Sequence, residues 1–260
     1  MAAMTALLEA RGVVKRFGGV VALDGLDLAV TAGEIIGLIG PNGSGKTTFF
    51  NVATGIYAAN AGCVMFDGAD ITRVPARAIY RAGVSRTFQR SRLSLPLSIF
   101  DNIMIGNHKR LNQGLWFNLV KRGDFKHEFE ASYRAARALV EVFEPALANR
   151  MFEPVAGLPM IDRRRIEICR ALISEPKLLL LDEPSAGMTH DETAELMNDI
   201  LIVRERNKDL TIIIVEHEMG VIERITNRCV VLNFGRKIAE GPYRDVAADA
   251  QVQEAYLGVA

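Results

Sequence analysis

One stretch decides the fold of this chain: Gly40-Pro41-Asn42-Gly43-Ser44-Gly45-Lys46-Thr47-Thr48. The apolar run Ile35-Ile36-Gly37-Leu38-Ile39 precedes it and is typical of a short buried strand. Residues 49–53 follow it and predict a helix that ends before Gly55. A strand, a glycine-rich loop ending in Gly-Lys-Thr, and a helix make up the full context of a P-loop. This context favours a P-loop over an ordinary glycine turn between a strand and a helix.

A P-loop binds a polyphosphate mainly through its backbone. Its glycines let N–H groups curl around the anion, and the N-terminus of the following helix adds partial positive charge and free donors. Lys46 can reach the β- and γ-phosphates, and the Thr47 hydroxyl can ligate Mg²⁺. The residues predicted to bind a nucleoside triphosphate are Gly40, Pro41, Asn42, Gly43, Ser44, Gly45, Lys46, Thr47 and Thr48.

Length and composition narrow the class of protein. The chain has 260 residues, which suits one sizeable domain or one domain with a sub-lobe. Hydrophobic residues make up 49% of the chain and charged residues 24%. This composition provides enough apolar side chains for a core and argues against a disordered chain. A formal net charge of +0 gives no support to nucleic-acid binding through bulk charge. No uncharged apolar stretch approaches the roughly 18 residues that a membrane helix needs, so we expect a soluble chain.

The segment before the P-loop strand predicts antiparallel strands. Residues 7–31 alternate between apolar and polar character, and Phe17 lies in a turn beside Gly18 and Gly19. An aromatic ring in such a turn can stack on a nucleotide base. It can equally fold back onto the core, and the sequence leaves both interpretations open.

A second group of candidate residues follows an apolar run late in the chain. Residues 177–181 are typical of a central parallel strand, and Asp182 and Glu183 come directly after it. Asp182 would hold Mg²⁺ through its water shell, and Glu183 would orient and polarise an attacking water. Two acids at a strand end can also be ordinary surface residues, but their pairing with a P-loop favours the catalytic interpretation.

Two further polar side chains end predicted strands. The strand over residues 211–215 leads to His217, at the end of a parallel sheet where ligands bind. A neutral imidazole there can hydrogen-bond the γ-phosphate or the water, whereas an isolated histidine is more often a satisfied core residue. The strand over residues 84–89 ends at Gln89, which can touch Mg²⁺ or the water and so sense the γ-phosphate.

Taken in order, these motifs resemble the ATPase subunits of ABC transporters. In that family they correspond to the adenine-stacking loop, Walker A, Q-loop, signature, Walker B, D-loop and switch histidine. The matching positions here are Phe17, residues 40–48, Gln89, residues 158–165, residues 178–183, residues 185–189 and His217. The resemblance covers nearly the whole chain, and seven motifs in register are very specific.

Finer details resemble one branch of the family. Residues 163–172, 214–219 and 252–258 are similar to the larger ATPase subunit of bacterial branched-chain (hydrophobic) amino-acid importers. That resemblance implies ATP and Mg²⁺ as cofactors and transport-coupled ATP hydrolysis. It further implies two membrane permease subunits, a second ATPase subunit and, indirectly, a periplasmic solute-binding protein as partners, with no nucleic acid. We expect the chain at the cytoplasmic face of the inner membrane, as a peripheral subunit.

The resemblance also predicts the architecture and the role of each site residue. We expect an α/β fold, namely a P-loop NTPase of ABC type with an antiparallel β subdomain and an inserted helical subdomain. The body with its β subdomain would span residues 1–89 and 158–241, the helical sub-lobe about 90–157, and a C-terminal helix about 242–257. The catalytic residues would be Glu183, His217 and Gln89; Thr47, Gln89 and Asp182 would face the metal, and Phe17 the base.

Two motifs depart from the family pattern. The signature, usually Leu-Ser-Gly-Gly-Gln, is Leu158-Pro159-Met160-Ile161-Asp162, and the D-loop ends in Met188-Thr189. The altered signature weakens the case for symmetric hydrolysis but not for ATP binding, and it predicts pairing with a second, different ATPase subunit. One alternative is a nucleotide-binding subunit with little turnover. Another is a soluble non-transport ABC ATPase, but those usually carry two ATPase domains or a long coiled coil, and this chain has one P-loop.

Overall fold

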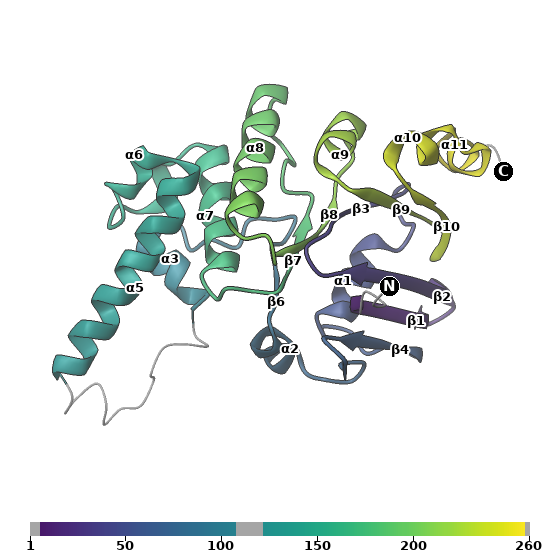
Figure 1. Cartoon of the computed structure of the whole chain (residues 1–260), viewed down its shortest axis with the longest axis horizontal. Helices are drawn as coiled ribbons and strands as arrows, with labels where there is room; N and C mark the ends of the chain where they lie inside the picture. Colours follow the sequence, from purple (N-terminus) through teal and green to yellow (C-terminus); the bar gives the residue numbers. More distant parts are fainter. Residues whose placement is uncertain (1–5, 108–121, 258–260) are drawn as a thin grey trace. The chain divides into compact units, whose positions relative to one another are not determined.

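The computed structural model describes residues 6–107 and 122–257 (Figure 1). The chain divides into two compact units. The sheet unit comprises the chain up to Arg86, Lys177–Pro184 and the chain from Asn207 onward. The helical unit comprises Thr87–Pro176 and Ser185–Arg206.

The larger sheet of the sheet unit carries the P-loop. Within the described chain it has six strands in the order β10-β9-β3-β8-β7-β6, parallel except for β10. Its strands are β3 (Ile35–Ile39), β6 (Val84–Arg86), β7 (Leu178–Asp182), β8 (Thr211–Val215), β9 (Arg228–Asn233) and β10 (Arg236–Gly241). Every residue of β3, β7 and β8 is buried, because both faces of a parallel sheet are covered.

A second, antiparallel sheet confirms the strands predicted before the P-loop. Its order in the described residues is β2-β1-β4-β5. These strands are β1 (Ala6–Phe17), β2 (Val20–Thr31), β4 (Ala61–Phe66) and β5 (Ala69–Asp70). The helix α1 (Lys46–Ala53) lies between the two sheets (Figure 1), and its fully buried Phe49 and Phe50 join one core cluster with side chains from both.

The helical unit is larger than the sub-lobe expected over residues 90–157, part of which, 108–121, lies outside the described residues. Its elements are α3 (Ile99–Ile105), α5 (Arg122–Phe143), α6 (Pro145–Ala148), the 3₁₀ turn η1 (Val155–Gly157), α7 (Met160–Leu172) and α8 (His190–Arg206). Helix α7 packs on α3 and α5, and α8 packs on α5 and α7, so both helices belong to this unit. A capping box begins α8, with Glu192 N donating to Thr189 Oγ1 and Thr189 N to Glu192 Oε2.

Two elements of the chain differ from prediction. The strand expected over residues 84–89 ends at Arg86. The single helix expected over residues 242–257 is two helices, α10 (Tyr243–Ala248) and α11 (Ala250–Leu257), because Asp249 is extended and its carboxylate accepts the N–H groups of Gln251 and Val252. The remaining described helices are α2 (Ala76–Ala82) and α9 (Met219–Ile225).

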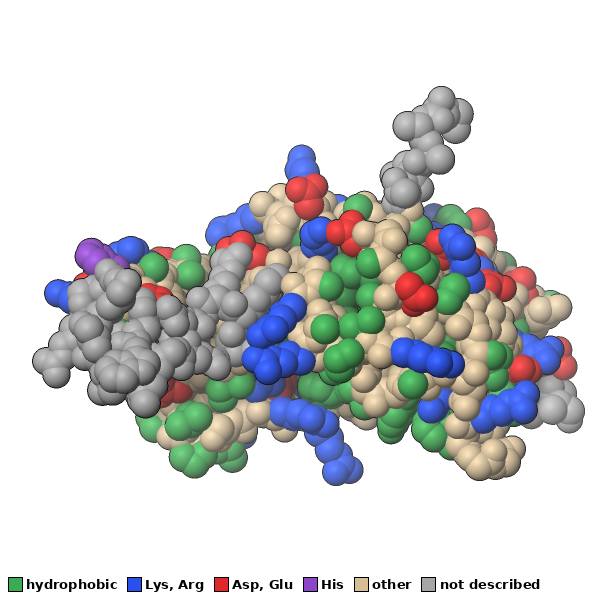
Figure 2. Space-filling view, turned by 90° about the horizontal axis from the view of Figure 1, so that it is seen from below, with side chains coloured by type: hydrophobic (Ala, Val, Ile, Leu, Met, Phe, Trp, Pro, Cys, Tyr) green, Lys and Arg blue, Asp and Glu red, His purple; other side chains and the backbone are tan. Residues whose placement is uncertain are grey.

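In the part of the chain that the structure describes, no helix is both long enough and apolar enough to cross a bilayer. On the face drawn in Figure 2, lysine and arginine side chains lie scattered among hydrophobic and acidic ones.

Candidate nucleotide-binding site

The P-loop connects the end of β3 to the start of α1, and two of its glycines are required by close packing. A Cβ at Gly40 would lie 2.1 Å from the carbonyl oxygen of Leu232, and one at Gly45 would lie 2.6 Å from that of Ala22. Both glycines have positive φ, 144° and 110° respectively. A Cβ at Gly43 would meet nothing within 4 Å, so the loop is open there. The loop is therefore tightly held at both ends and leaves room at its middle for a polyphosphate.

Lys46 places a buried cation beside this loop. Its ammonium donates to the carbonyl oxygens of Gly40 at 2.7 Å and Pro41 at 3.0 Å, and only 6% of the residue is exposed. Burial lowers the pKa of Lys46, although the carboxylates of Glu183 and Asp182 oppose that shift. Both hydrogen-bond acceptors are neutral carbonyls, and an anionic phosphate would bring a negative charge into direct contact with the ammonium.

The predicted catalytic acid and histidine lie together at the ends of β7 and β8. Glu183 Oε1 is 2.8 Å from His217 Nε2, and the Glu183 N–H donates to the Val215 carbonyl at 3.0 Å. Glu183 has a φ of 49°, a conformation that L-residues rarely adopt. Held between neighbouring strands in this backbone conformation, its carboxylate meets the imidazole. A side chain so placed can orient a water molecule at this edge of the sheet.

The donor set also fits Mg²⁺. Asp182 is buried at the end of β7, and Thr47 is exposed on the first turn of α1, so one carboxylate and one hydroxyl are available as hard oxygen ligands. Among residues 6–107 and 122–257 no group of three or more His, Cys, Asp or Glu side chains could hold a metal. Mg²⁺ usually binds through one or two protein ligands, with waters and phosphates completing its shell. The residues present fit that pattern and not an all-protein cage.

Phe17 does not fold back onto the core. The residue is 42% exposed at the end of β1, and its ring meets Tyr57 edge-on at a centroid distance of 5.1 Å. The ammonium of Lys15 lies 4.9 Å from the centroid of the same ring. An exposed, buttressed ring can stack on a base. Sequence reasoning missed Tyr57, although an aromatic residue shortly after the P-loop helix could have indicated it.

Gln89 and the altered signature both belong to the helical unit. The carbonyl oxygen of Gln89 accepts a hydrogen bond from Arg164, so Gln89 is not among the residues that the sheet unit brings together. Pro159 immediately precedes α7. Ile161 is buried, and the carboxylate of Asp162 accepts a hydrogen bond from Arg165 at 3.2 Å. The branched side chain thus turns into the unit, and the extra negative charge is partly neutralised.

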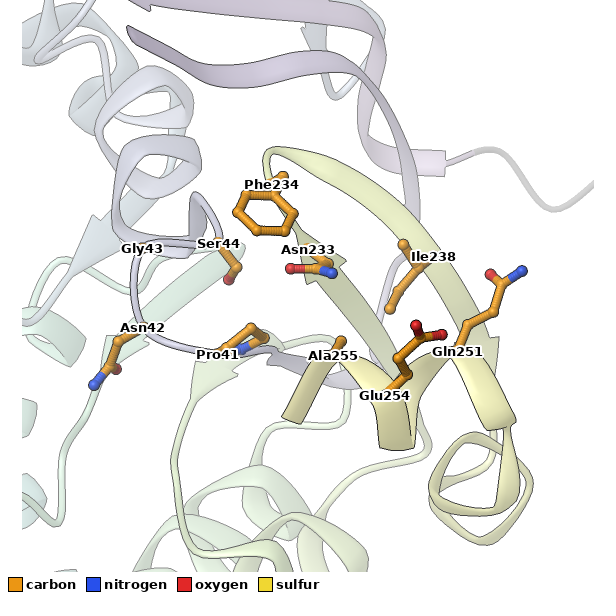
Figure 3. Close-up of a pocket in the computed structure, with 10 residues that line it drawn as sticks. All are labelled: Pro41, Asn42, Gly43, Ser44, Asn233, Phe234, Ile238, Gln251, Glu254 and Ala255. Atoms are coloured by element: carbon orange, nitrogen blue, oxygen red, sulfur yellow. The ribbon is translucent and has the colours of Figure 1, made fainter. Parts of the chain in front are cut away.

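A pocket of about 600 Å³ lies beside the P-loop, on the side of β9 and β10 (Figure 3). It is lined by P-loop residues 41–44, by Asn233, Phe234 and Ile238 of the β9–β10 hairpin, and by Gln251, Glu254 and Ala255 of α11. The strand order puts β9 and β10 on one side of β3, and β7 and β8 on the other. Tyr256 of α11 is 40% exposed, yet desolvation raises the pKa of its hydroxyl to about 12, and a backbone hydrogen bond from Gly40 opposes that rise. Helix α11 therefore packs against the start of the P-loop.

Family models match most of the chain. The model described as "ABC transporter" matches residues 23–186, and the one described as "Branched-chain amino acid ATP-binding cassette transporter" matches residues 236–260. Among curated proteins, the chain is 38% identical over 256 residues to the "High-affinity branched-chain amino acid transport ATP-binding protein LivG" of Escherichia coli (strain K12), covering 98% of each. It is 37% identical over 255 residues to the corresponding protein BraF of Pseudomonas aeruginosa, also covering 98% of each.

Solved structures agree with these matches. A nucleotide-free ATP-binding cassette from an ABC transporter has a TM-score of 0.83 at 29% identity, covering 97% of this chain and 99% of that chain. An ATP-binding cassette in its ADP conformation has the same TM-score and identity, covering 98% and 99%. These likenesses confirm the predicted α/β fold of the P-loop NTPase, ABC type. The chain therefore belongs to the ABC transporter family, as one of its ATP-binding, ATP-hydrolysing subunits.

Proposed function

We propose that the chain couples ATP hydrolysis to the import of branched-chain amino acids or related small solutes. The observation that carries this proposal is the contact between Glu183 and His217 at the edge of the sheet that also carries the P-loop. Similarity along nearly the whole chain to relatives named for branched-chain amino acid transport supports the solute class. The match of the C-terminal model over residues 236–260 supports it independently.

In this proposal the P-loop residues 40–48 hold the phosphates of ATP, and Lys46 moves from the loop carbonyls to the β- and γ-phosphates. Glu183 orients and polarises the water whose oxygen attacks the γ-phosphorus, while the bond to the β–γ bridging oxygen breaks and ADP leaves. His217 exchanges its hydrogen bond to Glu183 for one to the γ-phosphate or that water. Thr47 and Asp182 would hold Mg²⁺, which when bound neutralises phosphate charge.

The partners in this proposal are those of an importer. Two membrane permease subunits anchor the chain at the cytoplasmic face of the inner membrane, where it is peripheral, and a periplasmic binding protein delivers the solute. Gln89 leads from β6 into the helical unit, and we assign it the contact with Mg²⁺ or the water when ATP is bound. A second, different ATPase subunit supplies the signature that Pro159 does not. Nucleic acid has no part in this scheme.

The test is ATP hydrolysis by the complete transporter in proteoliposomes. The native complex is co-purified with its binding protein, and hydrolysis is measured while the binding protein is loaded with branched-chain amino acids, aromatic amino acids or short amides in turn. We expect stimulation by one apolar amino-acid class. Hydrolysis that none of these solutes changes, or a chain that co-purifies with no membrane subunit, would contradict the proposal.

A further inference from the structure

A buried arginine links three elements around the Mg²⁺ ligands, and the mechanism above does not use it. Arg86 is the last residue of β6, and its side chain is 5% exposed. The terminal nitrogen Nη2 donates to Asp182 Oδ2 at 2.6 Å, and the terminal nitrogen Nη1 donates to Asn51 Oδ1 at 2.6 Å. The same guanidinium lies 5.3 Å from the ring centroid of Phe50.

The two acceptors sit on the elements that carry the metal ligands. Asn51 lies one turn after Thr47 on α1, because residues four apart share a helix face. Asp182 ends β7, which pairs in parallel with β6. The guanidinium therefore spans from the Walker B carboxylate itself to the helix that presents Thr47. Its planar, rigid fork fixes both bonds at once, and the packing on Phe50 fixes its plane.

Stability alone is a weak explanation for this arrangement. A buried ion pair seldom stabilises more than well-packed apolar side chains of the same volume would. In contrast, residues that orient a ligand from behind commonly control metal affinity, and their loss costs about 10- to 100-fold. Arg86 has that relation to Asp182, since it holds one carboxylate oxygen and thereby sets the direction of the other.

We propose that Arg86 is a positioning residue for Mg²⁺. It holds Asp182 and the turn of α1 that carries Thr47 at the separation at which both residues bind one ion. This inference rests on the metal site proposed above. The Mg²⁺-dependent part of nucleotide affinity then requires Arg86, whereas the part contributed by the P-loop backbone and Lys46 does not.

The experiment separates these two parts of the affinity in the purified full-length chain. A fluorescent ATP analogue is titrated in EDTA and again in Mg²⁺, and the ratio of the two dissociation constants gives the gain from the metal. Arg86→Lys keeps the charge but cannot reach both acceptors. We expect it to bind within about twofold of wild type in EDTA and to lose about tenfold or more of the Mg²⁺ gain. Arg244→Met, which removes an exposed arginine paired with Glu223, should leave both values unchanged.

Two further measurements test the role of Arg86 through its second acceptor and through the metal. Asn51→Ala removes one acceptor without touching the ion pair, and should reduce the Mg²⁺ gain in the same direction by a smaller factor. The affinity for Mn²⁺ in the presence of ADP, measured by electron paramagnetic resonance, should fall in both variants in parallel with the Mg²⁺ gain. A wild-type Mg²⁺ gain in folded Arg86→Lys, or an equal loss of nucleotide affinity in EDTA and in Mg²⁺, would overturn the role of Arg86 but leave the metal site standing. A wild-type chain without any Mg²⁺ gain would overturn the metal site as well.

Discussion

At the scale of single residues, the site combines a strained backbone at Glu183 with a buried charge at Lys46. Glu183 holds a left-handed backbone conformation that costs a non-glycine residue on the order of 1 kcal/mol or more, and such strain tends to persist where function requires it. Lys46 is a buried cation whose pKa is lowered by that burial. Both residues are kept in unfavourable states beside the same loop. The bound phosphates would relieve the electrostatic part of that cost.

The base contact is tested at Phe17. Because its ring is exposed and held by Tyr57, Phe17→Ala should weaken ATP binding by about 1 kcal/mol, or roughly fivefold, the scale of one aromatic stacking pair. Phe17→Tyr should bind like wild type. The measurement is isothermal titration with ATP, with melting temperature recorded for each variant. Unchanged affinity in a folded Phe17→Ala protein would rule out stacking.

At the scale of elements, strongly patterned segments were predictable and long-range pairings were not. Strands β3, β7 and β8 are continuous apolar runs, and the turns that end β4 and β9 carry Asp67-Gly68 and Phe234-Gly235, so local sequence was sufficient. The pairing of Arg86 with Asp182 joins residues 96 positions apart, and no local pattern indicates it. The extent of the helical unit depends on how α7 and α8 pack, and this packing is again a tertiary interaction that no local pattern indicates. The break at Asp249 is local, but an acidic residue within a helical pattern is too common to mark an end.

Arg165 helps to anchor helix α7 within the helical unit by pairing with acidic residues outside its own helix. Arg165 donates to Asp199 at 2.9 Å and, more closely, to Glu195, both on α8, and it also pairs with Glu144 at 3.5 Å. Arg165→Met would leave the nearly buried Asp199 without its partner. We therefore expect the free energy of unfolding to fall by about 3 kcal/mol. Urea denaturation measures it, with exposed Arg134→Met on α5 as the control expected within about 0.5 kcal/mol of wild type. Equal stabilities of the two variants would refute the anchoring role.

The loop before α3 and the first turn of that helix divide their apolar residues between core and surface. Leu93, Ile99 and Phe100 are buried, whereas Leu95 is 44% and Leu97 40% exposed. Exposed apolar residues of this kind mark interaction sites, and we assign this one to the membrane subunits. In the reconstituted transporter, Leu95→Glu should uncouple ATP hydrolysis from transport without lowering the melting temperature. Leu93→Ala should instead lower the melting temperature, and normal coupling in Leu95→Glu would favour a purely structural loop.

At the scale of the whole assembly, we predict that the altered signature makes the two ATP sites unequal. In the family a signature segment faces the γ-phosphate held by the opposite subunit. Here Pro159 offers neither hydroxyl nor N–H before α7, and Met160, which is exposed, follows it. Losing one such donor can cost on the order of a hundredfold in rate. A homodimer would therefore have two impaired sites, while a heterodimer would keep one competent site built on this chain's Lys46, Asp182 and Glu183.

The most direct test compares the two sites within the assembled transporter. Glu183→Gln keeps the shape of the side chain but removes the carboxylate that orients the water, so ATP should bind and remain uncleaved. Hydrolysis by the complex should fall at least about a hundredfold, the scale of one general base. The matching substitution in the partner ATPase subunit should cost much less. Two equal losses, or brisk hydrolysis by this chain purified alone as a homodimer, would contradict the account.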